Sequence, residues 1–178
     1  GEGCESGGHI GELTTMALIP QLADATDLPL LAAGGIADGR GFAAALMLGA
    51  CGVQMGTRFL AAYECTIHRN YKDKILEAGD RATVVTGARL GHPVRSIKNQ
   101  FARDYLKAEY SDIADQDLEK MAEGVLKIAV TEGDVKKGCF LAGQIAALVR
   151  KEQPAGEIIR EVINEAEPLL KGAPQWVK

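Results

Sequence analysis

Two short segments rich in apolar residues, each ending at glycine, stand out in the pattern of the chain. Residues 30–33 read Leu-Leu-Ala-Ala and lead into Gly34-Gly35, while residues 52–55 read Gly-Val-Gln-Met and lead into Gly56. Short runs of this kind, without a regular polar face, are typical of strands buried on both sides in a parallel sheet. We therefore predict two buried strands that each end in a glycine turn.

The residues between these strands have the pattern of a helix. Asp38 is a suitable N-cap, and Phe42, Ala45 and Leu48 recur at helical spacing before Gly49. The order strand, helix, strand is that of a right-handed crossover between parallel strands. The pattern therefore predicts an α/β fold.

Helical spacing predominates in the rest of the chain. Leu18, Leu22 and Ala25 predict a helix that ends near Ala25 and has Pro20 in its first turn. After about Phe59 the periodicity is helical throughout. We expect helices near residues 66–78, 94–108, 115–131, 139–151 and 155–170.

Two strands are too few for an independent parallel sheet, which normally has both faces covered by helices. The sequence therefore predicts that this chain is the C-terminal part of a larger α/β protein.

The opening segment, residues 1–11, contains five glycines and one histidine, His9. Glycine lets a backbone adopt positive φ and approach a ligand closely, so the segment suggests an imidazole held against a bound molecule. A flexible leader has the same composition.

Gly34-Gly35 and Gly56-Thr57 follow the two predicted strands, where backbone N–H groups of an α/β barrel bind phosphate. A tight turn is the simpler interpretation of either glycine pair alone.

Composition narrows the class of ligand. The chain has 178 residues, of which 47% are hydrophobic and 25% charged, with a net charge of −4 and a pI near 5.4. These values are ordinary for a globular protein and argue against nucleic-acid binding, which favours a basic excess. The longest apolar runs, residues 28–33 and 42–48, are far shorter than the roughly 18 residues of a membrane-spanning helix. We expect small-molecule or protein partners and no membrane insertion.

The four cysteines are scattered, which predicts unpaired thiols in a reducing compartment, by default the cytoplasm. Cys65 and His68 have the spacing of half a metal site, but no second pair follows them, so we predict no metal. Cys4 lies near His9 without a third, orienting group, and we interpret it as a bystander thiol.

Three motifs together resemble the nitronate monooxygenase / FMN-dependent enoyl-ACP reductase family. They are EGCESGGHIG at residues 2–11, LAAGGIADG at 31–39 and VQMGTRF at 53–59. LTTM at residues 13–16 and GHPVRSIKNQ at 91–100 resemble the enoyl-ACP reductase branch more closely than the nitronate branch. The resemblance extends to about residue 165.

The resemblance implies a flavin-binding (β/α)₈ TIM barrel. Residues 1–62 would be its C-terminal part with the last two parallel strands, and residues 63–178 a mostly helical region packed on it. The first five or six strands are not in this chain. His9 matches the family's catalytic histidine, and Ser6 stands where alanine is common. The positions that match FMN contacts are Glu2, Gly7, Gly8, Gly34, Gly35, Gln54, Met55, Gly56 and Thr57, the last four at the phosphate.

The implied activity is that of an FMN-dependent enoyl-ACP reductase of bacterial type II fatty-acid synthesis. Its substrate is an enoyl thioester on acyl carrier protein or CoA, its electron donor is NAD(P)H, and a homodimer is possible. The alternative within the family is a nitronate monooxygenase, which oxidises alkyl nitronates with dioxygen. A further alternative is that residues 1–178 alone are an inactive fragment.

A basic segment remains to be interpreted. Arg95, Lys98 and Arg103 would share part of a face on the expected helix 94–108, with Arg89, His92 and Lys107 nearby. An acidic carrier protein could dock there. A solvated helix face is the interpretation we favour.

Overall fold

The parallel strands lie where the sequence predicts them. The structure is a computed structural model that describes residues 1–173. Strand β2 (Leu31–Ala33) pairs in parallel with β3 (Gly52–Gln54), and helix α2 (Gly39–Met47) connects them. The Asp38 carboxylate accepts hydrogen bonds from the backbone N–H groups of Arg40 and Gly41, as an N-cap does. The α/β class and the strand–helix–strand unit are confirmed.

The opening segment adds a third parallel element on the other side of β2. Gly3 N–H donates to the Ala33 carbonyl over 2.9 Å, and Ala33 N–H donates to the Gly1 carbonyl over 2.9 Å. Glu2 forms a parallel bridge with Ala33. The flexible-leader interpretation is therefore wrong, because the first residues are paired within the sheet.

Helix α1 (Thr15–Ala25) begins earlier than the sequence predicts. Pro20 lies in its second turn rather than its first. The start is fixed by a tertiary contact, since the Glu5 carboxylate accepts hydrogen bonds from Thr15 N–H over 2.9 and 3.1 Å. A carboxylate ten residues away is not visible as a local helix signal.

A second, antiparallel sheet has the order β1 (Gly8–His9), β5 (Val94–Ile97), β4 (Thr83–Thr86). The predicted helix over residues 94–108 is therefore wrong in its first part, as is the expectation of helical structure throughout the region after Phe59. Helix α5 (Gln100–Glu109) begins only after Asn99, whose side chain accepts from Ala102 N–H over 2.9 Å. Pairing of Val94–Ile97 with strands on both sides overrides its apparent helical spacing.

The remaining helices agree with the sequence in part. Helices α4 (Arg69–Leu76) and α8 (Ala155–Gly172) match their predicted ranges, and α3 (Thr57–Leu60) is an additional short turn. The predicted helix 115–131 is divided at Gly124, which has a φ of +71°, into α6 (Asp115–Ala122), α7 (Val125–Lys127) and a π-helical turn (Ile128–Glu132).

The predicted helix over residues 139–151 is wrong. Only a 3₁₀ turn, Gln144–Leu148, is present there. Ile97 N–H donates to the Phe140 carbonyl over 2.8 Å, and Leu141 forms an antiparallel bridge with Ser96. The chain therefore runs extended beside β5 before the turn.

Two apolar cores support these sheets. The first lies around β2 and includes Ile19, Ala32, Ile36, Ala45 and Ala50. The second contains Tyr71, Ile75, Ile97, Phe140 and Val149, and it joins α4 to β5.

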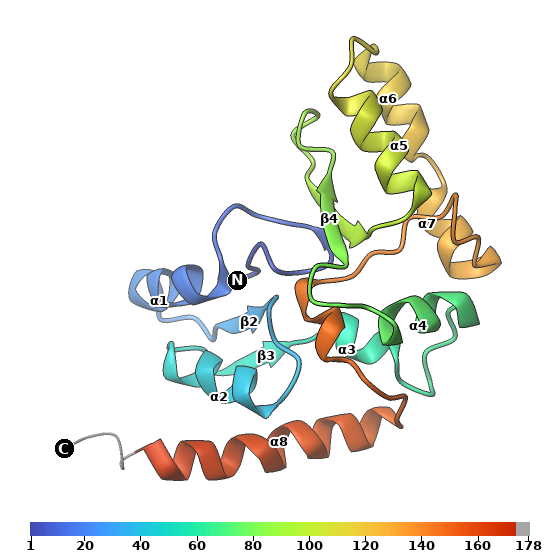
Figure 1. Cartoon of the computed structure of the whole chain (residues 1–178). Helices are drawn as coiled ribbons and strands as arrows, with labels where there is room; N and C mark the ends of the chain where they lie inside the picture. The colour runs from blue at the N-terminus through green and yellow to red at the C-terminus, as the bar shows by residue number, and fades with distance from the viewer. Residues whose placement is uncertain (174–178) are drawn as a thin grey trace.

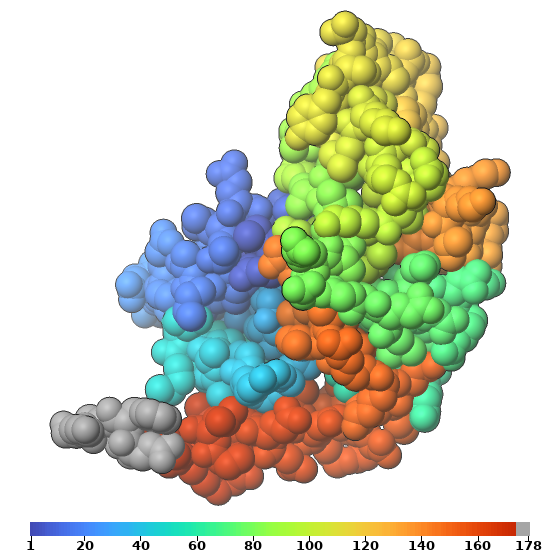
Figure 2. All heavy atoms as spheres, viewed as in Figure 1, coloured from blue at the N-terminus to red at the C-terminus, as the bar shows by residue number. Residues whose placement is uncertain are grey.

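Figure 1 shows α8 running alongside α2, and α5 and α6 projecting away from the parallel strands. Figure 2 shows the same projection in yellow, separated by a recess from the blue N-terminal residues. The division at residue 62 stays a prediction.

The contact between α2 and α8 depends on Gly39. A Cβ at this position would lie 2.3 Å from the Glu165 Cβ and 2.5 Å from Ala166 N. We expect Gly39→Ala to destabilise the protein that contains this chain by about 2–3 kcal/mol, because the two helices must separate. Gly156→Ala is the matched control, since its Cβ would come no closer than 3.6 Å to another group, Arg160 Nη1. The free energy of urea-induced unfolding measures both effects, and equal stability of the two variants would contradict the close packing.

Within residues 1–173, none of the helices combines the length and apolar character needed to span a membrane.

Candidate active site

A polar cavity lies where the three parallel segments end. Its volume is about 140 Å³, and its walls come from the opening segment, from the turn after β2 and from the turn after β3. Eight of the nine residues predicted to bind a cofactor line it: Glu2, Gly7, Gly34, Gly35, Gln54, Met55, Gly56 and Thr57. Gly8 lies beside it in β1 and does not line it. The structure thus brings together residues that are up to 55 positions apart.

The glycines allow this cavity to form. Gly34 and Gly35 have φ values of +88° and +73°, which side-chain-bearing residues rarely adopt. A Cβ on Gly7 would lie 2.6 Å from the Ala142 carbonyl carbon, so the opening segment touches that backbone directly. Gly56 differs, because a Cβ there would have nothing within 4 Å. The cavity therefore has closely packed walls and open space beside Gly56.

Several polar groups of the cavity are hydrogen-bond donors that suit ligand oxygen atoms, although two carboxylates, Glu2 and Glu5, also line it and the Glu5 carboxylate is bound by Thr15. Ser6 lines the cavity, and its buried Oγ has no hydrogen-bond partner within residues 1–173. An unpartnered buried hydroxyl is costly, by about 1–3 kcal/mol. Thr57 Oγ accepts from Gly143 N–H over 2.8 Å, which leaves its own proton free to donate. Two hydroxyl donors and glycine N–H groups fit a phosphate.

Six lining residues were not predicted as cofactor contacts: Glu5, Ser6, Ala33, Ile36, Gly143 and Ile145. Glu5 joins the opening segment to α1 through Thr15. A Cβ on Gly143 would lie 2.7 Å from the Glu5 carbonyl oxygen, so a glycine is needed there too. This glycine was visible in the sequence, but it fell inside the wrongly predicted helix over residues 139–151.

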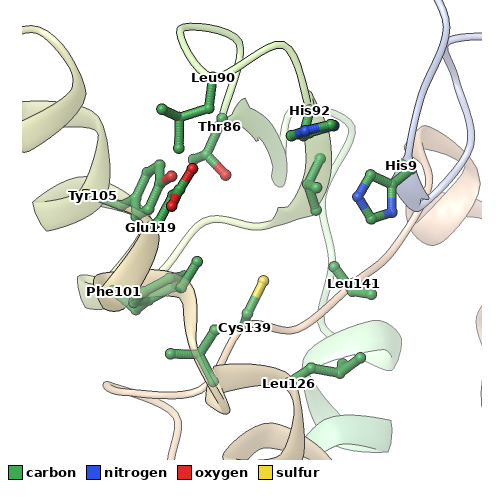
Figure 3. Close-up of a pocket in the computed structure, with 14 residues that line it drawn as sticks. His9, Thr86, Leu90, His92, Phe101, Tyr105, Glu119, Leu126, Cys139 and Leu141 are labelled. Atoms are coloured by element: carbon green, nitrogen blue, oxygen red, sulfur yellow. The ribbon is translucent and has the colours of Figure 1, made fainter. Parts of the chain in front are cut away.

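His9 lies outside the polar cavity and lines a second space, which we call the apolar pocket. This pocket has a volume of about 330 Å³. Figure 3 shows His9 and His92 on one side of the pocket and Tyr105 and Glu119 on the opposite side. The rings of His9 and His92 are 6.5 Å apart between centroids and nearly perpendicular. His9 is exposed at this edge, so its imidazole is accessible to a ligand.

Two chain segments connect the polar cavity with the apolar pocket. Gly7 lines the cavity and His9, two residues later, lines the pocket. In the same way Leu141 lines the pocket and Gly143 lines the cavity. A molecule bound in one space therefore touches backbone segments that also form the other.

The predicted basic helix face does not exist, because Arg95 is in strand β5 and buried. Its Nε and Nη2 groups donate to the Cys4 carbonyl over 3.1 and 2.9 Å. Burial lowers the pKa of the Arg95 guanidinium. Lys98 donates to the Arg81 carbonyl over 2.7 Å on the surface. Arg95 therefore anchors the opening segment and is not available to a docking protein.

Known proteins resemble this chain over most of its length. A family model described as nitronate monooxygenase matches residues 1–165. FabK from Thermotoga maritima is 45% identical, with a TM-score of 0.95, over 99% of this chain and 56% of that chain. A nitroalkane oxidase from Streptomyces ansochromogenes is 31% identical, with a TM-score of 0.79, over 97% of this chain and 52% of that chain.

A curated relative matches a similar share of this chain. The probable nitronate monooxygenase of Staphylococcus saprophyticus is 37% identical over 182 residues, which cover 95% of this chain and 50% of the relative. The chain spans about half the length of the relatives it matches.

Proposed function

The chain belongs to the nitronate monooxygenase family of FMN-dependent oxidoreductases, and we propose that the protein containing it is an FMN-dependent enoyl-ACP reductase of bacterial type II fatty-acid synthesis. The observation that carries this proposal is the likeness to FabK, an enoyl-ACP reductase, which exceeds the likeness to the nitroalkane oxidase in both sequence identity and superposition. A cytoplasmic protein, a homodimer and NAD(P)H as electron donor belong to the same proposal.

We infer that the three parallel segments are the last strands of a (β/α)₈ barrel. They are the opening residues, β2 and β3, and all three end at the polar cavity. The remaining strands, with the rest of the flavin site, would come from sequence outside this chain, since the relatives are about twice as long. Activity belongs to the protein that has all of these strands.

The polar cavity would hold the FMN phosphate. Ser6 and Thr57 would donate from their hydroxyl groups, and N–H groups around Gly34, Gly35 and Gly56 would face the same oxygens. When bound, FMN supplies the hydride that reduces the substrate. The volume of the cavity suits a phosphate group rather than a whole flavin.

His9 would act on the thioester. It lies at the edge of the apolar pocket, two residues from the cavity-lining Gly7. Histidine is the side chain that exchanges protons most readily near neutral pH. It could give a proton to the α carbon of the enoyl thioester or donate a hydrogen bond to its carbonyl oxygen.

Nitronate oxidation is the second candidate, and the family model and the curated relatives favour it. In that reaction the same imidazole would contact the nitronate or its α proton. Reductase activity predicts NAD(P)H oxidation that depends on crotonyl thioester, whereas nitronate activity predicts oxygen uptake that depends on an alkyl nitronate. Steady-state assays of the purified, FMN-loaded protein measure both. Nitronate-dependent oxygen uptake without any thioester-dependent oxidation would refute the reductase.

A further inference from the structure

We propose that the apolar pocket beside His9 holds the distal part of a medium-length acyl chain and thereby sets the chain-length preference of the enzyme. This inference rests on the proposed reductase function. It goes beyond that function because it assigns the acyl end of the substrate to particular residues.

The position of the pocket suits an acyl chain whose thioester lies beside His9. Figure 3 shows His9 and His92 at one side, Phe101 at the opposite side below Tyr105 and Glu119, and Cys139 between them. A thioester carbonyl at the imidazole would direct its hydrocarbon tail away from the polar cavity and toward these residues. The polar thioester of such a substrate would then lie beside the imidazole, and its apolar tail would lie among apolar side chains.

The walls of the pocket come from separate elements and are mostly apolar. Val94 contributes from β5, Phe101 from α5, Leu126 from α7 and Leu141 from the extended segment beside β5. The volume of about 330 Å³ lies within the ~300–1,000 Å³ range of ligand sites. If a methylene displaces about as much volume as a water molecule, ~30 Å³, there is room for roughly ten carbon atoms.

A short nitronate would leave most of this space unfilled, whereas an acyl chain gains from filling it. Burial of one methylene improves binding by about fourfold. The polar side chains that line the pocket are His9 and His92 on one side, Tyr105 and Glu119 on the other, and Thr86 between them. The remaining lining side chains are apolar apart from the Cys139 thiol, and they offer contact area that suits a hydrocarbon.

Cys139 provides a direct test of the pocket. Its thiol points into the space in Figure 3, its side chain is buried, and burial raises the pKa of the thiol, so the thiol is a neutral apolar surface. Cys139→Phe would fill the centre with a ring. Val125→Phe would fill the same space from another element. Cys51→Phe is the control, because it adds a ring at an exposed cysteine that lines neither the pocket nor the cavity.

The experiment compares kcat/KM for crotonyl and decenoyl thioesters in the FMN-loaded protein. We expect both pocket-filling variants to lower kcat/KM for the decenoyl substrate by about 50- to 250-fold, the contribution of three or four methylenes. Their kcat/KM for the crotonyl substrate should fall much less, because that substrate is too short to reach the filled space, and both values for Cys51→Phe should stay within about twofold of wild type. Equal losses on both substrates, or no loss on either, in both filling variants would overturn the proposal.

A binding measurement separates this inference from the proposed function. Decanoyl pantetheine is titrated calorimetrically into the wild type and into Cys139→Phe and Val125→Phe. We expect the filling variants to weaken its binding by a similar factor, and wild-type binding that both variants leave unchanged would overturn the pocket assignment. Absence of thioester reduction in a wild type that binds decanoyl pantetheine through this pocket would instead contradict the reductase.

Discussion

Replacing His9 with glutamine is expected to lower kcat/KM for crotonyl thioester by about 10²- to 10⁴-fold, the usual contribution of a positioned acid or base. Glutamine keeps a hydrogen-bonding side chain of similar length but cannot exchange a proton near neutral pH. The FMN content should not change, because His9 lines the apolar pocket and not the polar cavity. Steady-state NAD(P)H oxidation and the flavin absorbance of the purified variant measure these two effects separately.

His68→Asn is the control for the loss of an imidazole. The His68 ring nitrogen Nδ1 accepts from Asn70 N–H over 3.0 Å at the start of α4, and asparagine preserves an acceptor at that N-cap. We expect wild-type activity from this variant. His92 is the other imidazole of the pair. A 10²- to 10⁴-fold loss of kcat/KM in His92→Gln, with no such loss in His9→Gln, would show that His92 carries the proton and that our assignment is wrong.

Gly56→Val is expected to weaken FMN binding by about 100-fold, or ~2.7 kcal/mol. A Cβ at position 56 would have no other protein atom within 4 Å, and Gly56 has an ordinary negative φ of −95°. The protein alone therefore offers no steric reason for a defect. A defect would arise only if a ligand group occupies the polar cavity beside Gly56, where we place the phosphate.

Gly79→Val is the matched control, because its Cβ is equally free and it lines neither the polar cavity nor the apolar pocket. Equilibrium dialysis of FMN against the apoprotein measures the dissociation constant of each variant. The thermal midpoint of the apoprotein should be similar for both. Undiminished FMN binding by Gly56→Val would show that the phosphate lies elsewhere.

The sequence predicted those features that depend on local signals. Asp38 and Gly34-Gly35 mark a cap and a turn by residue type alone, and the parallel strands follow from their order. Because parallel strands end on the same side of a sheet, the glycines after β2 and β3 were expected to meet. Strand order therefore predicts that these glycines lie together, whereas Glu2, Gly7, Gln54 and Met55 were assigned to the site only through the family resemblance.

The features that the sequence did not predict depend on contacts between distant residues. β1 pairs with β5 across more than 80 positions, and no local signal in Val94–Ile97 specifies that partner. Arg95 was read as part of a basic face because its long-range contact with the Cys4 carbonyl is invisible in the sequence. The apolar pocket was missed for the same reason, since its walls come from several separate elements.

The contact between α2 and α8 has a consequence for synthesis of the chain. Gly39 N–H donates to Glu165 Oε2 over 3.0 Å, and the two residues are 126 positions apart. A ribosome adds about 5–20 residues each second, so the second residue follows the first after roughly 6–25 s. During that interval β2, α2 and β3 lack the helix that covers them, and their apolar side chains are open to other nascent chains. Chaperone binding during translation would have its largest effect on this region.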